Sequence, residues 1–220
     1  MQNTQSYDQQ SALVHELVAN TLQPNNHELL RHLGQVLGIK AQDRLLLIIG
    51  SNSDAAQQML AEAFDCEVEV FAGDLGTLPY ESEQFHSAIV TVPLTKDLHA
   101  VARELSRVLK PAGSLGMVIF SVYRDQMPED TEPDQVLPLI STARPAAVYR
   151  AVLAECGFTA FVTKDRRRDL KRAALDSYRE HMLHSSADAP VPAPDLSNQA
   201  LGLLASGSVS ITLITAEKGL

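Results

Sequence analysis

Residues 44–50 read Arg-Leu-Leu-Leu-Ile-Ile-Gly, and the five positions after the arginine are continuously apolar. So short an apolar run, ending at a glycine, is typical of a strand that is buried on both faces of a parallel sheet. The next residues, 51–54, read Ser-Asn-Ser-Asp and supply side chains that cap helix N-termini. A helix follows, because its apolar positions are Met59, Leu60, Ala63 and Phe64. This strand–turn–helix unit predicts an α/β fold.

The same alternation continues along the chain. Further strands are predicted over residues 66–71, 87–92, 115–122, 158–163 and 208–216. Helices are predicted around residues 13–18 and over residues 29–37, 98–109, 146–156 and roughly 167–182. Alternating strands and helices form a mostly parallel, doubly wound sheet with helices on both faces. We therefore expect about six strands, the last of them antiparallel to the rest.

Composition narrows the class of protein. The 220 residues, 45% of them hydrophobic, suit one domain with a full core. A formal net charge of -9 argues against a nucleic-acid partner, which needs a basic face. Apolar runs are shorter than the roughly 20 residues of a membrane span, and residues 1–5 show no secretory pattern. With two cysteines, too few for a disulfide framework, a cytoplasmic location without membrane contact is expected.

Two segments concentrate charge of opposite sign. Residues 125–134 hold five acidic residues and two prolines, whereas residues 164–172 hold six basic ones. The basic segment is favoured as the solvated face of a helix, with an anion or partner site as the alternative. The pair of segments also predicts protein contact, either in a homodimer or with a different subunit.

Several stretches follow a shared pattern. They are residues 45–50, Gly73-Asp74-Leu75 before Leu78-Pro79-Tyr80, residues 85–90, residues 104–113 and residues 153–158. Together they resemble the class I S-adenosylmethionine-dependent methyltransferases, most specifically through Arg-Val-Leu-Lys-Pro-Ala-Gly at 107–113. The likeness runs from about Gln23 to Lys218 and is strongest to the small-molecule branch, which includes quinone and arsenite methyltransferases. It implies one Rossmann-like domain over residues 1–220, with a helical cap (1–43), a cofactor half (44–122) and a C-terminal half (123–220).

In such a fold, ligands bind beyond the carboxyl ends of the parallel strands. The candidate cofactor-binding residues are therefore Gly50, Ser51 and Asn52 in the first turn, with Asp74, Leu75 and Thr91. No residue is assigned as catalytic. Among the weak candidates for a general base, His27 is the best. The histidines and cysteines show no metal-ligand spacing.

The departures from the family pattern decide the functional prediction. The resemblance places an acidic residue where Ile48 stands, and glycines where Asn52 and Asp54 stand. A helix and a strand, roughly 20 to 25 residues, are missing after residue 71. Asp74 can replace one of the two acidic anchors of the family but cannot fill both roles.

The sequence therefore predicts a methyltransferase-like pseudoenzyme, a non-catalytic binding or regulatory subunit. S-adenosylmethionine should bind with a dissociation constant weaker than about 1 mM, because each lost charged anchor costs about 2–5 kcal/mol. The alternative is a divergent S-adenosylmethionine-dependent methyltransferase that acts on a small molecule and holds the cofactor through backbone groups and Asp74. A nucleic-acid-modifying enzyme is disfavoured, since Thr91-Val92-Pro93-Leu94 occupies the place of its Asn/Asp-Pro-Pro-Tyr motif.

Overall fold

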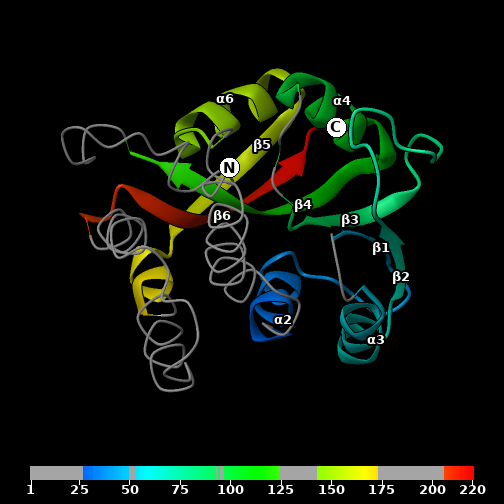
Figure 1. The fold of residues 1–220 in the computed structure, drawn as a ribbon. Helices are drawn as coiled ribbons and strands as arrows, with labels where there is room; N and C mark the ends of the chain where they lie inside the picture. Colours follow the sequence, from blue (N-terminus) through cyan, green and yellow to red (C-terminus); the bar gives the residue numbers. More distant parts are fainter. Residues whose placement is uncertain (1–26, 50–52, 93, 95–96, 124–142, 173–205) are drawn as a thin grey trace, which may run out of the picture.

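The computed structural model describes residues 27–49, 53–92, 94, 97–123, 143–172 and 206–220. In this part of the chain six strands form one mixed sheet in the order β2-β1-β3-β4-β6-β5 (Figure 1). The strands are β1 (Arg44–Ile48), β2 (Glu67–Phe71), β3 (Phe85–Val90), β4 (Leu109–Val122), β5 (Phe158–Asp165) and β6 (Val209–Lys218). Strand β1 runs parallel to β2 and β3, and β3 parallel to β4, whereas β6 is antiparallel to β4 and β5. The predicted doubly wound sheet with an antiparallel last strand is confirmed.

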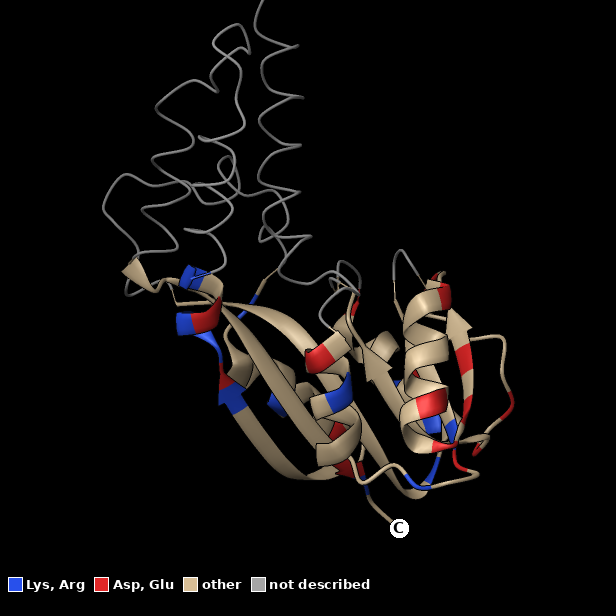
Figure 2. Cartoon of the chain, turned by 90° about the horizontal axis from the view of Figure 1, so that it is seen from below, with Lys and Arg blue, Asp and Glu red and all other residues tan. Residues whose placement is uncertain are grey.

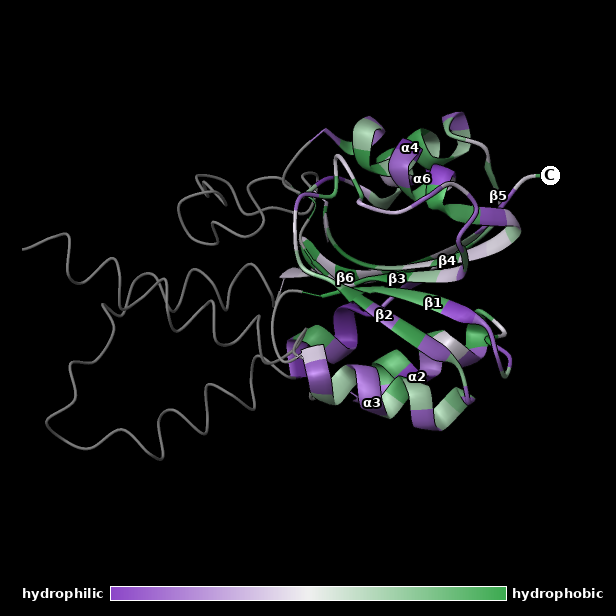
Figure 3. Cartoon of the chain, turned by 90° about the vertical axis from the view of Figure 1, so that its right-hand side faces the viewer, coloured by the Kyte–Doolittle hydropathy of each residue, from purple (hydrophilic) through white to green (hydrophobic). Residues whose placement is uncertain are grey.

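Helices cover both faces of the sheet. Figure 3 shows α2 (His27–Val36) and α3 (Ser53–Phe64) on one side, and α4 (Leu98–Val108) and α6 (Ala146–Glu155) on the other. Four predicted segments lie wholly or partly outside the described residues. They are the helix at 13–18, the acidic loop at 125–134, the linker that the proline- and alanine-rich sequence of residues 187–194 predicts, and the basic helix beyond residue 172, of which residues 167–172 are helical.

Strand β1 separates two hydrophobic cores. Leu45 and Leu47 belong to the cluster with α2 and α3, whereas Leu46 and Ile48 belong to the cluster with α4 and α6. All four side chains are at most 1% exposed. The continuous apolar run that opens the strand–turn–helix unit is therefore explained by burial on both faces.

Strand β2 forms one edge of the sheet. Residues 72–84, which join it to β3, contain neither helix nor strand. The N–H of Glu67 donates to the carbonyl of Asp43, and the carbonyl of Phe71 accepts from the N–H of Ile49. Residues 67 and 71 therefore face β1, and the alternate residue Val68 presents its carbonyl to the free edge. The Gln57 side chain of α3 donates to that carbonyl at 2.7 Å. The shortened chain thus covers part of its own edge.

Strand β4 is longer than predicted at its beginning. The sequence predicts residues 115–122, but pairing with β3 starts at Leu109, and residues 110–113 form an irregularity between two paired segments. Pairing with β3 ends at Met117, whereas pairing with β6 continues to Val122. The last five residues of β4 therefore extend about 17 Å past the end of β3, at about 3.4 Å per residue. We call residues 118–122 and their partners 209–213 the overhang.

Candidate functional site

The carboxyl ends of β1 and β3 meet at one edge of the sheet, where the fold places ligands. Three predicted site residues, Gly50, Ser51 and Asn52, lie outside the described residues. Thr91 does reach this edge, directly after β3. Its N–H and its hydroxyl both donate to the carbonyl oxygen of Ile48, at 2.9 and 3.3 Å. Thr91 thereby ties the ends of β1 and β3 together.

Ile48 is the residue at which the resemblance predicts an acidic anchor. Its side chain is 1% exposed and belongs to the apolar cluster on the α4 and α6 side of the sheet. An acidic side chain here would lie in a hydrocarbon environment, where a charge without a partner is strongly disfavoured.

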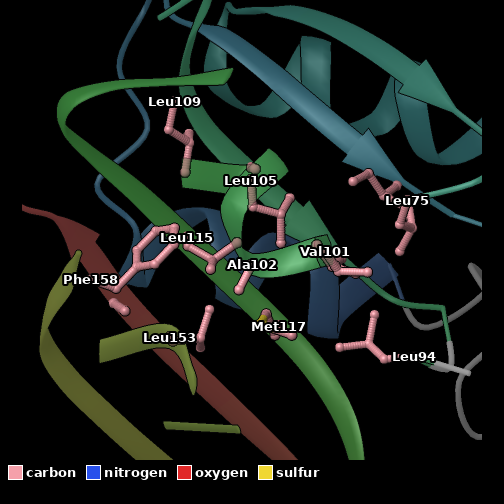
Figure 4. Packing of buried hydrophobic residues seen from close by; sticks show 14 of the residues in the cluster. Leu75, Leu94, Val101, Ala102, Leu105, Leu109, Leu115, Met117, Leu153 and Phe158 are labelled. Carbon is pink, nitrogen blue, oxygen red and sulfur yellow. The ribbon is translucent and has the colours of Figure 1, made fainter. Parts of the chain in front are cut away.

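Asp74 and Leu75 lie side by side in the 72–84 loop and point to different environments. Asp74 is exposed, and its Oδ1 accepts the N–H of Gly76 at 3.0 Å, closing a local turn. Leu75 is buried in the same cluster as Ile48. Figure 4 shows Leu75 and Leu94 at one end of this cluster, next to Val101 of α4. The two candidate residues are therefore not presented on a common surface.

Two charged residues of α4 hold this loop in place. Glu104 Oε2 accepts the N–H of Leu78 at 2.8 Å, and Arg107 donates to the carbonyls of Leu78 and Tyr80 at 3.0 and 2.7 Å. Arg107 also binds both carboxylate oxygens of Glu104 at 2.8 Å. These hydrogen bonds from Arg107 lower the pKa of Glu104, more than burial raises it. We call Glu104 and Arg107 the clamp. Both belong to the motif at 104–113, but the motif alone does not indicate this role.

The most specific family motif also has a structural function. In Lys110-Pro111-Ala112-Gly113, Ala112 has a φ of 58°. A Cβ on Gly113 would lie 2.8 Å from the carbonyl oxygen of Lys110 and 3.1 Å from that of His86. Only a glycine fits so close an approach of two backbones. The motif lies at the beginning of β4, and the predicted cofactor site lies at the other end of the strands.

A second polar region, which no sequence pattern indicates, lies on the overhang. Ser121 of β4 pairs with Ser210 of β6, and Thr212 of β6 pairs with Asp165 of β5. These four side chains share the face that carries Ile119 and Ile214 of the α4 and α6 cluster. We call Ser121, Ser210, Thr212 and Asp165 the polar strip. Four interleaved strand positions cannot be recognised as one group before the strand register is known.

Hydrogen bonds within the polar strip are unevenly distributed. Ser210 donates to Asp165 Oδ1, and Arg167 donates its N–H and Nε–H to the same carboxylate at 2.9 and 2.6 Å. Burial raises the pKa of Asp165, but the bonds from Ser210 and Arg167 outweigh it and lower the pKa overall. The Arg167 guanidinium also lies 4.5 Å from the centre of the Tyr123 ring. The hydroxyls of Ser121 and Thr212, by contrast, are buried and have no hydrogen-bond partner within the described part of the chain.

His27, the candidate general base, is the first residue of α2. Its Nε2 is buried without a hydrogen-bond partner. Tyr149 of α6 is 4% exposed, and its burial raises its pKa. Among the described residues no group of histidine, cysteine or acidic side chains could hold a metal ion. Nor does any helix in this part of the chain have the length and apolar character of a membrane span.

Charge is distributed unequally over the two ends of the sheet. Figure 2 shows acidic residues at the end formed by α3 and β2, and basic residues at the opposite end, after β5. The acidic end carries Asp54, Glu62, Asp65, Glu67 and Glu69, and the basic end exposes Lys164, Arg168, Lys171 and Arg172.

Solved structures share this architecture. The Haemonchus contortus phosphoethanolamine N-methyltransferase 2, in complex with S-adenosyl-L-methionine, matches 88% of this chain with a TM-score of 0.71 and 13% identity; the match spans 53% of that enzyme. The match to the Streptomyces coelicolor geranyl diphosphate C-methyltransferase covers 87% of this chain and 78% of that enzyme, with a TM-score of 0.64 and 16% identity. The chain has a class I methyltransferase-like fold.

A third similar solved structure is that of the cyclase SpnF, and the match covers 88% of this chain and 82% of that cyclase. Its TM-score is 0.66 and its identity 17%. No protein-family model and no curated protein matches the sequence. The TM-scores establish the methyltransferase-like fold, and identities this low leave the reaction open.

Proposed function

We propose that this protein is a methyltransferase-like pseudoenzyme, a non-catalytic binding or regulatory subunit that does not depend on S-adenosylmethionine. The observation that carries the proposal is Ile48, an apolar residue 1% exposed where the family places an acidic anchor. A core position of this kind offers no hydrogen-bond acceptor to a ligand.

The other described residues of the predicted cofactor site support the same conclusion. Strand β2 ends at Phe71, an aromatic residue that offers no acidic side chain to a ligand. Asp74 already accepts a hydrogen bond from its own turn, and Thr91 donates to Ile48. These residues fit S-adenosylmethionine poorly, because their polar groups are engaged within the protein.

The methyltransferase-like fold is compatible with a function other than methyl transfer. One of the similar structures is named as a cyclase, although others are methyltransferases. A fold of this type is a scaffold, and its chemistry depends on the site that it carries.

The alternative, a divergent small-molecule methyltransferase, has one specific observation in its favour. The Asp74 carboxylate is exposed and belongs to the loop that follows β2. If it exchanged its local turn for a ligand, it would supply one of the two anchors.

Calorimetric titration of the full chain with S-adenosylmethionine and S-adenosylhomocysteine tests the proposal. We expect a dissociation constant weaker than about 1 mM for both ligands. A low-micromolar constant would refute the pseudoenzyme and favour the alternative.

A double variant separates two causes of weak binding. Asn52→Gly with Asp54→Gly restores the glycines of the first turn but adds no acidic anchor. We expect it to leave binding weak. Micromolar binding by this variant would instead assign the defect to steric filling of the turn, with Asp54→Gly alone as the matched control.

A further inference from the structure

The two outermost strands of the sheet, β2 and β5, differ in how open their edges are. On β2 the Gln57 side chain donates to the outward carbonyl of Val68. On β5 six of the eight residues are exposed. Val162 of β5 is 60% exposed, and it is the one exposed large hydrophobic residue in the described strands. The accessible edge of the sheet is therefore that of β5.

The backbone groups of β5 point alternately toward β6 and away from it. Arg166, directly after β5, donates its N–H to the carbonyl of Ile211 in β6 at 2.8 Å. Residues that exchange such hydrogen bonds alternate with residues that do not. Because the register is regular over residues 162–165, Thr163 and Asp165 direct their N–H and C=O groups away from β6. In the described sheet no strand lies beyond β5, so these groups face outward.

The charge around this edge is positive (Figure 2). Asp165 pairs with Arg167, and Asp169 pairs with Arg166, so neither carboxylate is left to neutralise other cations. Four exposed basic side chains on β5 or directly after it form no ion pair within the described part of the chain: Lys164, Arg168, Lys171 and Arg172. A partner that pairs with the β5 edge therefore meets unneutralised cations.

We propose that the β5 edge binds an extended acidic segment of a different protein, which adds to the sheet as an antiparallel strand. The outward backbone groups of Thr163 and Asp165 would supply the hydrogen bonds, and the cations would select the sequence. This inference rests on the proposed function, because a non-catalytic binding or regulatory subunit needs a protein partner, and it states the chemistry of that partner.

The side chains of β5 specify a pattern in the added strand. Val162 and Lys164 lie on the same face of the sheet, since alternate residues of a strand do so. Directly opposed side chains interact across a strand pair. An apolar residue is therefore expected opposite Val162, and an acidic residue opposite Lys164. Further acidic residues on its N-terminal side would lie toward the cations that follow β5.

The same features disfavour a second copy of this chain as the added strand. Pairing of β5 with β5 would bring together two identical sets of exposed cations, and like charges across a strand pair are destabilising. The acidic strand β2 of a second copy has its outward Val68 carbonyl occupied by Gln57. An irregularity between Thr159 and Val162 further limits regular pairing to a short stretch, as is common at protected edges.

Amide hydrogen exchange of the full-length protein, followed by NMR, tests the proposal. The probe is the end-blocked synthetic peptide Glu-Glu-Thr-Glu-Thr-Val-Thr, which places valine opposite Val162 and glutamate opposite Lys164. We expect saturable shifts and slower exchange at the amides of Thr163 and Asp165. The amides of Val162 and Lys164 already bond to β6 and should change little in exchange.

Two control peptides separate strand addition from simple charge attraction. Lys-Lys-Thr-Lys-Thr-Val-Thr reverses the charge. Glu-Glu-Thr-Glu-Pro-Val-Thr keeps the charge but lacks the N–H that would donate to the carbonyl of Thr163. Both should bind at least about tenfold more weakly, the second because one hydrogen bond is lost.

Variants of β5 identify the edge from the side of the protein. Thr163→Pro removes an outward N–H but none of the bonds to β6, and should weaken peptide binding about tenfold. Thr163→Val, the matched control, keeps the N–H and should bind normally. Lys164→Glu should weaken binding severalfold, whereas Arg103→Glu on α4 should not, and this pair decides the test if Thr163→Pro does not fold.

Several results would overturn the proposal. They are the absence of a saturable shift at Thr163 with the acidic peptide, equal binding of the proline peptide, and unchanged binding in a folded Thr163→Pro protein. S-adenosylmethionine titrated into the same sample keeps the two proposals apart. Tight binding of that ligand would refute the pseudoenzyme, and the exchange of the Thr163 amide would still decide the β5 edge.

Discussion

The cofactor half and the overhang differ in how their polar groups are hydrogen-bonded. In the cofactor half, the residues that resemble methyltransferase motifs make hydrogen bonds within the protein: Thr91 to Ile48, Asp74 to Gly76, and the clamp to the 72–84 loop. On the overhang no motif is recognisable, yet two buried hydroxyls lack partners. A sequence motif can thus have a structural role that needs no ligand.

The clamp gives part of the sequence pattern at 104–113 a structural role that requires no cofactor. The 72–84 loop crosses directly from β2 to β3 in place of a helix and a strand, so its backbone has no sheet neighbour. Glu104 and Arg107 satisfy that backbone from α4. Leu78 is buried in this mostly exposed loop, and its peptide groups would be unstable there without partners.

The largest expected effect is at Ile48, in the cofactor half. Ile48→Asp introduces the family's acidic residue into an apolar cluster, so the free energy of unfolding should fall by more than about 3 kcal/mol. Ile48→Val, the matched control, should cost about 1 kcal/mol. Urea denaturation at pH 7 measures both changes.

A stable Ile48→Asp protein would contradict this description of the cofactor half. If that variant also bound S-adenosylmethionine, the position would be a functional anchor lost by substitution and not a structural core position.

A smaller effect is expected at the clamp, and it depends on pH. The pKa of Glu104 in the folded protein lies below its ordinary value of 4.5, so its stabilising effect is complete above that value and is lost as pH falls through the folded pKa. Glu104→Gln should lower the free energy of unfolding by about 1–3 kcal/mol at pH 7. The difference from the unmodified protein should shrink below pH 4.5.

Glu155→Gln is the control for the clamp. Glu155 pairs with His99 at 3.0 Å but its side chain is 66% exposed, so the change should cost less than about 1 kcal/mol. Equal losses in the two variants would show that the clamp is an ordinary surface ion pair. A Glu104→Gln effect that is the same at pH 3.5 and pH 7 would show that the charge of Glu104 does not contribute to stability.

The smallest expected effect concerns the two charged ends, for which we propose weak contact with a second copy of the chain. The acidic end around α3 and β2 and the basic end after β5 are complementary, and exposed pairs contribute little individually. Sedimentation velocity should detect self-association in low salt that is lost at about 0.5 M salt. Arg168→Glu with Lys171→Glu should abolish it, whereas Arg103→Glu, an exposed change on α4, should not. A protein that stays monomeric at high concentration in low salt would contradict the proposal.

Local patterns in the sequence determined the elements of this fold. The apolar run at 45–49 predicted a strand buried on both faces, and the helical spacing at 98–109 predicted α4 to within one residue. The short connection after residue 71 predicted that a helix and a strand are missing. These predictions succeed because burial on one or two faces imposes a periodicity on neighbouring residues.

Only the tertiary structure decided which polar groups meet. Ser121 faces Ser210 across 89 positions of the sequence, and Glu104 reaches Leu78 across 26. Strand register and helix packing create such contacts, and a shift of one residue would turn Ser121 to the other core. The sequence could therefore indicate a departure from the cofactor motif, but the clamp and the polar strip could be recognised only from the register of the folded chain. The reason is that hydrogen-bond partners are set by distance in space and not along the chain.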